Sequence, residues 1–259
     1  MNIQTLRPST RTQAFLALML ATVSLAGCTT PLPDPAVRYI AFGDSTTAGP
    51  ASRQYWEFLR DDLGQPADSF AGQGKGGEPT AEGLVRLRSV LDNGIYPNAE
   101  ALLYWEGGND VLDFVKNHDP LLLFSPKAAD YPFGGDLATS LDTTQASIEE
   151  AIRLGRQAGL AVYVATYFYL NAQTGQCKPA LLGVLLPSQQ AHVTEYVQLL
   201  NDRIRLAAAG AGAVLVDVAG QADTIAADSA NYVNCNHLSE KGNQIVAGIF
   251  EAAIQAHAN

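Results

Sequence analysis

The stretch RYIAFGDSTTAG, residues 38–49, is an apolar segment that runs directly into a turn. A continuous apolar run of this length, Arg38 to Phe42, predicts a strand buried on both faces, as in a parallel sheet. Gly43 and Asp44 favour a tight turn after it. Ser45 is therefore expected at a corner where a strand ends, with its side chain exposed at the edge of the sheet.

Strand and helix patterns alternate along the rest of the chain. Further strands are expected at 69–71, 101–105, 160–167 and 213–218, and helices at 55–63, from Thr80, and at 143–158, 188–208 and 239–256. Alternation of this kind implies right-handed crossovers and a parallel sheet covered by helices on both faces. It predicts an α/β protein, a three-layer α/β/α sandwich with about five strands. Residues 116–136 and 171–187 do not fit the pattern and are expected to be long loops that shape a site.

Three further motifs accompany Ser45 at places where ligands of such sheets bind, beyond the carboxyl ends of the strands. They are a glycine cluster at 72–77, Gly107-Gly108-Asn109-Asp110, and His237 ahead of the last helix. Together they supply a serine nucleophile, N–H donors for an oxyanion, an uncharged amide donor at Asn109 and a histidine base. These are the groups needed to attack an ester carbonyl.

Each motif alone has an ordinary interpretation. Gly-Asp-Ser occurs in turns and helix caps, Asn after Gly is common in loops, and a lone histidine is more often a surface or capping residue. The cluster at 72–77 also suggests a phosphate loop, but Lys75 precedes Gly76 and no Gly-Lys-Ser/Thr ending follows. The histidines lack zinc-ligand spacing, so we expect no metal and no cofactor.

In combination, the four motifs resemble the conserved blocks of the SGNH (GDSL) hydrolase superfamily of esterases and lipases, from about Val37 to Ala256. The resemblance implies a flavodoxin-like sheet. It also implies Ser45 as nucleophile, His237 as base, and an oxyanion hole made by Ser45, Gly77 and Asn109. The implied reaction is two-step acyl transfer from an ester to water.

Two positions depart from the family pattern. Gly72 stands where the second block usually begins with Asn, and Asn234 stands where an Asp is expected three residues before the histidine. An Asn can orient an imidazole, but it gives no charge to stabilise the imidazolium, and its NH₂ group could select the wrong tautomer. Three outcomes are open: a Ser45–His237 dyad oriented by Asn234 or a backbone carbonyl, Asp228 as the missing carboxylate, or a degraded site.

The N-terminus resembles a bacterial lipoprotein signal. Arg7 and Arg11 precede the apolar segment 14–26, and Leu25-Ala26-Gly27-Cys28 resembles a lipobox, in which the signal is cut before a cysteine that carries lipid. The alternative is an ordinary secretory signal with an incidental cysteine. The expected domains are a signal peptide at 1–27, a tether at 28–36 and a hydrolase domain at 37–259. The expected location is the bacterial cell envelope, on the periplasmic face of the outer membrane or the cell surface, with membrane attachment through the lipid.

Export also makes Cys177 and Cys235 candidates for a disulfide that pins the histidine loop, the alternative being two free, buried thiols. Without residues 1–27 the chain carries 14 basic and 26 acidic side chains, a formal net charge of −12. That balance argues against nucleic acid or an anionic membrane surface as an electrostatic partner.

The expected function is a monomeric serine esterase that acts on a small-molecule, lipid or acetylated glycan ester. The apolar stretch 180–187, with Phe168 to Leu170, suggests a wall for an acyl chain, and a short buried helix is the alternative. Two other functions share the motifs: an acyltransferase with the same Ser-His machinery, and a non-catalytic envelope lipoprotein that binds such ligands in a degraded pocket.

Overall fold

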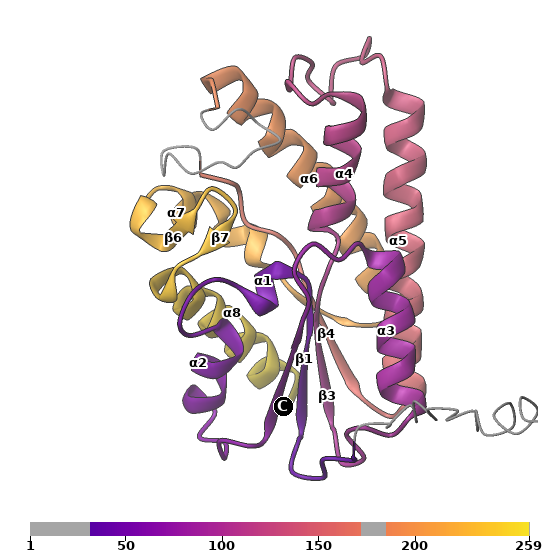
Figure 1. Cartoon of the computed structure of the whole chain (residues 1–259), viewed down its shortest axis with the longest axis vertical. Helices are drawn as coiled ribbons and strands as arrows, with labels where there is room; N and C mark the ends of the chain where they lie inside the picture. Colours follow the sequence, from indigo (N-terminus) through magenta and orange to yellow (C-terminus); the bar gives the residue numbers. More distant parts are fainter. Residues whose placement is uncertain (1–31, 172–184, 259) are drawn as a thin grey trace, which may run out of the picture. The chain divides into compact units, whose positions relative to one another are not determined.

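A computed structural model describes residues 32–171 and 185–258 of the chain (Figure 1). Its centre is a five-stranded parallel sheet in the order β2-β1-β3-β4-β5. The strands are β1 (Tyr39–Gly43), β2 (Phe70–Gly74), β3 (Ala101–Trp105), β4 (Ala161–Ala165) and β5 (Val214–Val216). This is the flavodoxin-like strand order, so the predicted fold class is confirmed.

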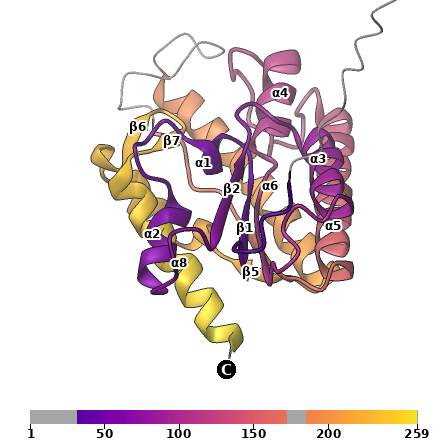
Figure 2. The same cartoon turned by 60° about the horizontal axis from the view of Figure 1, so that its bottom comes forward.

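Helices cover both faces of the sheet, as a parallel sheet requires (Figures 1 and 2). α2 (Tyr55–Asp62) and α8 (Glu240–Ala258) pack together on one face. α3 (Thr80–Asp92), α5 (Gly134–Gln157) and α6 (Pro187–Ala211) form the layer on the other. The remaining elements are α1 (Ser45–Ala48), α4 (Gly108–His118), η2 (Val218–Gln221), α7 (Ala222–Ala226), η3 (Ser229–Asn231), β6 (Tyr232–Asn234) and β7 (His237–Leu238).

Strand β3 lies in the middle of the sheet, and this position explains why its sequence is apolar throughout. Leu102, Leu103, Tyr104 and Trp105 are completely buried, so both faces of the strand are covered. The ends of β1 and β3 are in register, with Gly43 opposite Trp105. The turns that follow these two strands therefore start side by side at one edge of the sheet.

Three predictions about the elements were incomplete. Residues 108–118, for which no helix was predicted and whose last three residues fall in the expected loop at 116–136, form helix α4, because Val111, Phe114 and Val115 provide a buried face at helical spacing. Helix α5 begins at Gly134, nine residues before the predicted start. His237 lies in a short antiparallel hairpin, β6–β7, and not in a plain loop.

Several predictions fall on residues outside the described part of the chain. They concern the signal peptide at 1–27, lipidation of Cys28, the first residues of the tether, the side chain of Cys177, and most of the apolar stretch 180–187. At the end of that stretch Leu185 is buried and Leu186 is exposed. Among the described helices, none is both long and apolar enough to cross a bilayer.

Candidate active site

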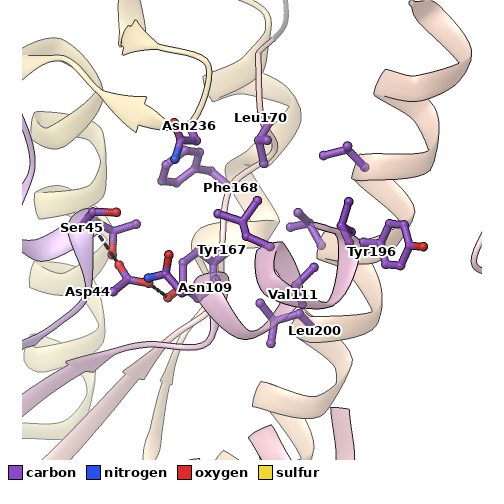
Figure 3. Close-up of a pocket in the computed structure, with 16 residues that line it drawn as sticks. Asp44, Ser45, Asn109, Val111, Tyr167, Phe168, Leu170, Tyr196, Leu200 and Asn236 are labelled. Carbon is purple, nitrogen blue, oxygen red and sulfur yellow. Dashed lines mark hydrogen bonds between the residues drawn. The ribbon is translucent and has the colours of Figure 1, made fainter. Parts of the chain in front are cut away.

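Ser45 is the first residue of the short helix α1, directly after the turn that ends β1. Asp44 caps this helix: its Oδ1 accepts hydrogen bonds from the Thr46 backbone N–H at 2.7 Å and from the Thr46 hydroxyl at 2.8 Å. The cap fixes the turn, and the serine side chain faces a cavity (Figure 3). The predicted position of Ser45 at an exposed strand corner agrees with the structure.

The glycine cluster follows β2 and lies against the serine turn. The Lys75 N–H donates to the Gly43 carbonyl at 2.9 Å, and a side chain at Gly74 would overlap the backbone of α1. A Cβ on Gly76 would lie 3.9 Å from the Cβ of Ser45. Gly77 has a φ of +78°, a conformation that favours glycine. The glycines therefore allow this backbone to approach the nucleophile closely.

The departure at Gly72 has a local steric explanation. Gly72 lies within β2, and a Cβ at this position would overlap the indole ring of Trp56. Trp56 belongs to α2 and fills the space that a longer side chain would need. An Asn at position 72 is incompatible with the present position of Trp56.

Asn109, in the first turn of α4, is held beside the glycine cluster. Its Nδ2 donates one hydrogen bond, of 3.0 Å, to the carbonyl of Glu78, and its side chain lines the same cavity as Ser45. Within residues 32–171 and 185–258 the second hydrogen of this NH₂ group has no acceptor, so it is available to a ligand. Among the described residues, the backbone N–H groups of Ser45 and Gly77 donate to no protein acceptor. The three predicted oxyanion donors thus belong to neighbouring turns and retain N–H groups for a ligand.

Asp44 is buried beneath the serine and is also bonded to Tyr167, which lies two residues after the end of β4. The Tyr167 hydroxyl donates to Asp44 Oδ2 at 2.8 Å (Figure 3). Burial raises the pKa of Asp44 to about 6, against the opposing effect of the hydrogen bonds from Thr46 and Tyr167. Tyr167 is itself positioned by Asn201, whose amide bonds both the backbone N–H and the carbonyl of Tyr167. This chain of contacts links the floor of the site to helix α6.

His237 and Asn234 face each other across the β6–β7 hairpin, and β7 lies against α1. His237 Nδ1 is 3.0 Å from Asn234 Oδ1. Burial lowers the pKa of His237 below its ordinary value of 6.5, so the ring is a neutral base at pH 7. In the described part of the chain no hydrogen bond joins His237 to Ser45, and catalytic hydrogen bonds of this kind often tighten only when substrate is bound.

The hydrogen bonds of Asn234 decide which tautomer of His237 is present. Its Oδ1 also accepts the backbone N–H groups of Asn236 and His237, at 3.1 and 3.0 Å. Turning the amide over would place its NH₂ against these two donors, so the oxygen must face the imidazole. Nδ1 therefore carries the proton, and the lone pair of Nε2 is available as a base. The predicted risk that the NH₂ group selects the wrong tautomer does not apply in this hairpin.

Asp228, the alternative third member, is engaged elsewhere. Its Oδ1 caps η3 through the Ala230 N–H at 2.9 Å, and its Oδ2 accepts from Lys241 at 2.6 Å. The structure therefore brings Asn234, and not Asp228, to the histidine. Cys235, between Asn234 and His237, is disulfide-bonded, and its partner lies outside the described residues. The alternative of a free thiol at Cys235 is therefore wrong.

A cluster of ionisable side chains that the sequence analysis missed lies next to the glycine cluster and consists of Arg86, Glu78 and Glu106. Arg86, from α3, donates to the Glu78 carboxylate and to the backbone carbonyls of Gln73 and Gly43. Burial alone would raise the pKa of Glu78, but the hydrogen bonds and charge of Arg86 hold it below its ordinary value. Arg86 and Glu78 thereby tie the glycine turn to the end of β1. A charged residue directly after an apolar strand, Glu106, was the sequence signal for this cluster.

Glu106 is the neutral member of this cluster. Burial, together with the charges of Asp44 and Glu78, raises its pKa to about 10. Its Oε2 accepts a hydrogen bond from the Tyr104 hydroxyl, and its carboxyl also bonds the side chain of Glu78. At neutral pH the proton therefore resides on Glu106, and Glu78 carries the negative charge opposite Arg86.

We predict that Glu106→Gln changes the pH dependence of stability. The folded wild-type protein holds a proton that the unfolded chain releases above pH 4.5. Wild-type stability due to this group is present below pH 4.5 and is lost as pH rises towards 10. Gln does not titrate. The free energy of unfolding of the variant minus that of the wild type should therefore increase by about 1.4 kcal/mol per pH unit between pH 5 and 8.

Urea unfolding of both proteins across this range measures the effect. The control is Glu82→Gln, which removes an exposed carboxylate on the same helix as Arg86. Stability curves of wild type and Glu106→Gln that run parallel with pH would contradict the assignment of the proton to Glu106.

The cavity beside Ser45 lies between the sheet edge and helices α4 and α6, and its volume is about 60 Å³. Asp44, Ser45 and Asn109 lie at one end, and Val111, Leu200 and Tyr196 at the other (Figure 3). Of the predicted apolar wall, Phe168 and Leu170 line the cavity and Tyr169 does not, while most of the stretch 180–187 lies outside the described residues. Within residues 32–171 and 185–258 no group of His, Cys, Asp and Glu side chains is arranged to hold a metal ion.

Comparison with known proteins places this site in a family. The sequence model of the GDSL-like Lipase/Acylhydrolase family matches residues 41–245, which include all four motifs. No curated protein matches the sequence.

Solved structures share the fold at low sequence identity. A GDSL-like lipase from Bacteroides thetaiotaomicron is 17% identical, with a TM-score of 0.55 over 86% of this chain and 89% of that one. The psychrotrophic esterase EstA from a Pseudoalteromonas species is 16% identical, with a TM-score of 0.56 over 87% and 100% of the two chains. The acetyl xylan esterase AlAXEase is 20% identical, with a TM-score of 0.52 over 84% and 100%. The chain belongs to the GDSL-like lipase/acylhydrolase family, and it is a hydrolase of the SGNH type.

Proposed function

We propose that the protein hydrolyses carboxylic esters through an acyl-enzyme on Ser45, with His237 as the general base. The observation that carries the proposal is the hydrogen bonding of Asn234, which leaves His237 with its proton on Nδ1 and a free lone pair on Nε2. An inactive descendant of such an enzyme would have no need to keep a histidine in this tautomer on a hairpin that packs against α1. The retained arrangement therefore supports catalysis.

In the first step His237 Nε2 takes the proton of the Ser45 hydroxyl while Oγ attacks the ester carbonyl carbon. The carbonyl oxygen becomes an oxyanion, stabilised by the N–H groups of Ser45 and Gly77 and by the free N–H of the Asn109 amide. The carbon–oxygen bond to the alcohol then breaks, and His237 gives its proton to the leaving oxygen. In the second step His237 takes a proton from water as the water oxygen attacks the acyl carbon. The bond from that carbon to Ser45 Oγ then breaks, His237 returns its proton to Oγ, and the acid leaves.

Asn234 orients His237 by a neutral hydrogen bond and not by a charge. An aspartate at this position would also stabilise the imidazolium that forms in each step. We therefore propose an active but electrostatically weaker dyad, oriented by Asn234. An acyltransferase would use the same groups and differ only in the acceptor. A lipid anchor at Cys28 and a place in the bacterial envelope are likewise our proposals, and they rest on the sequence of residues 1–28.

Hydrolysis of p-nitrophenyl acetate, butyrate, hexanoate and longer esters by the fragment from Leu32 onward tests the proposal. We expect release of p-nitrophenol with the free acid as the second product. Acyl transfer to an added sugar in preference to water would identify a transferase. Binding of esters with no turnover of any of them would identify a binding protein.

We predict opposite effects for two substitutions at Asn234. Asn234→Ala removes the acceptor of Nδ1–H and should lower kcat about 10- to 100-fold, the scale of a hydrogen bond to a group that becomes charged. Asn234→Asp supplies a negative charge, so it should raise the pKa of His237, move the acid limb of kcat/KM to higher pH, and raise kcat above that limb.

The pH profiles of the two variants and the wild type, measured with one ester, provide the test. Asn93→Asp, which adds the same charge at the exposed end of α3, is the matched control. The orienting role of Asn234 is refuted if Asn234→Ala keeps wild-type kcat and the same acid limb.

A further inference from the structure

The cavity beside Ser45 has a polar end and an apolar end, and this division carries information about the substrate. Its polar side chains, including Asp44, Ser45 and Asn109, are gathered where the reaction takes place. Away from them, the walls are formed by Val111 and Val115 of α4 and by Val193, Val197 and Leu200 of α6. All five of these aliphatic side chains are buried in the protein core.

The hydroxyl groups of the two tyrosines in the cavity wall are already bonded to protein groups. The Tyr167 hydroxyl is bonded to Asp44 Oδ2. The Tyr196 hydroxyl is bonded to the hydroxyl of Tyr131. Because the other walls of this space are apolar, a sugar placed here would leave most of its hydroxyl groups without partners, and each such loss costs free energy. An alkyl chain has no such requirement.

The position of the base decides which part of the ester occupies the cavity. His237 is not among the residues that line it, although the neighbouring Asn236 lies at its rim. The leaving alcohol must remain within reach of His237, which donates a proton to it. Asn109, which would bind the carbonyl oxygen, is part of the cavity wall and precedes the apolar Val111 on α4 by two residues. The acyl chain therefore points between α4 and α6, and the alcohol points away.

The size of the cavity limits the length of the chain. A cavity of about 60 Å³ is several times the roughly 10–15 Å³ needed to admit one water molecule. On that scale it holds a row of about four or five non-hydrogen atoms. This space is larger than an acetyl group needs and smaller than a long fatty acyl chain needs.

Building on the proposed function, we propose that the space between α4 and α6 is the acyl-binding pocket and that it selects esters of short unbranched fatty acids, from butyrate to hexanoate. Val197, in the middle of the α6 wall, is a specificity-determining residue. Acetylated glycans and long-chain lipids are then poor substrates.

Substitution of Val197 in both directions tests the pocket. Val197→Phe fills the space, so the ratio of kcat/KM for p-nitrophenyl hexanoate to that for the acetate should fall by about tenfold or more, the scale of a methylene in an apolar pocket. Val197→Ala lengthens the space and should move the optimum towards octanoate. Leu206→Ala, at an exposed position of the same helix, should leave both the ratio and the optimum unchanged.

A binding measurement keeps the pocket testable apart from catalysis. Titration of ethyl hexanoate into Ser45→Ala should show binding, and the Ser45→Ala/Val197→Phe double variant should lose it. If the wild type hydrolyses no ester but Ser45→Ala binds hexanoate in this Val197-dependent way, the proposed hydrolysis fails and the pocket assignment stands. The assignment is overturned if Val197→Phe lowers activity equally on acetate and hexanoate, or if binding is unaffected by it.

Discussion

Ser45→Ala should lower kcat for ester hydrolysis by about 10⁴-fold or more, the largest loss that we expect from any single substitution. The change removes the only atom that forms the acyl bond. It leaves the Asp44 cap in place, because that cap is formed with Thr46 and Tyr167. Thermal unfolding should therefore remain close to that of the wild type while turnover is lost.

Ser52→Ala is the matched control for this experiment. Ser52 is an exposed serine in the loop after α1, and its hydroxyl bonds Glu240 on α8. We expect full activity from this variant. Retention of more than a small fraction of turnover by Ser45→Ala would place the nucleophile elsewhere and overturn the account of the site.

His237→Ala should cost nearly as much as Ser45→Ala, because the two groups act as one unit and the serine is a weak nucleophile without its base. Added imidazole should restore part of the activity, which a merely structural role for His237 would not allow. Since burial lowers the pKa of His237, the acid limb of the wild-type kcat/KM profile should fall below pH 6.5, and the rescued variant should instead follow the titration of free imidazole.

His257→Ala serves as the control, since His257 lies at the exposed C-terminal end of α8. We expect it to keep wild-type kinetics. If His237→Ala keeps its activity, or if imidazole fails to rescue a folded variant, His237 is not the base.

The parts of the fold that were predictable from sequence are those set by short-range patterns. Residues 101–105 are apolar throughout because the strand is buried on both faces, and β3 has these bounds in the structure. Helix α4 was missed because Gly107 to Asp110 have the composition of a turn. In the structure Gly107, with a φ of +129°, is the N-cap of a helix that begins at Gly108, only three positions after the last residue of β3.

The sequence was sufficient to predict which groups form the candidate site. It was not sufficient to predict how those groups are oriented or which of them carry protons. Ser45 and Asn109 were found because each follows the end of a predicted strand, and His237 because it precedes the last helix and the other motifs require a base. The orientation of Asn234 depends on two backbone N–H groups of the hairpin, which only the folded geometry supplies. The proton on Glu106 depends on burial and on the charges of Asp44 and Glu78, 62 and 28 positions away along the chain, which tertiary structure brings together.

Covalent labelling with diethyl p-nitrophenyl phosphate tests the central claim, a Ser45 nucleophile activated by His237, most directly. Intact mass should show one diethylphosphoryl group per chain, peptide mapping should place it on Ser45, and ester hydrolysis should disappear in proportion to labelling. Ser45→Ala should take up no label, and His237→Ala should label far more slowly. A fully folded wild-type protein that takes no label, or carries the label on another residue while its activity is lost, would contradict the account.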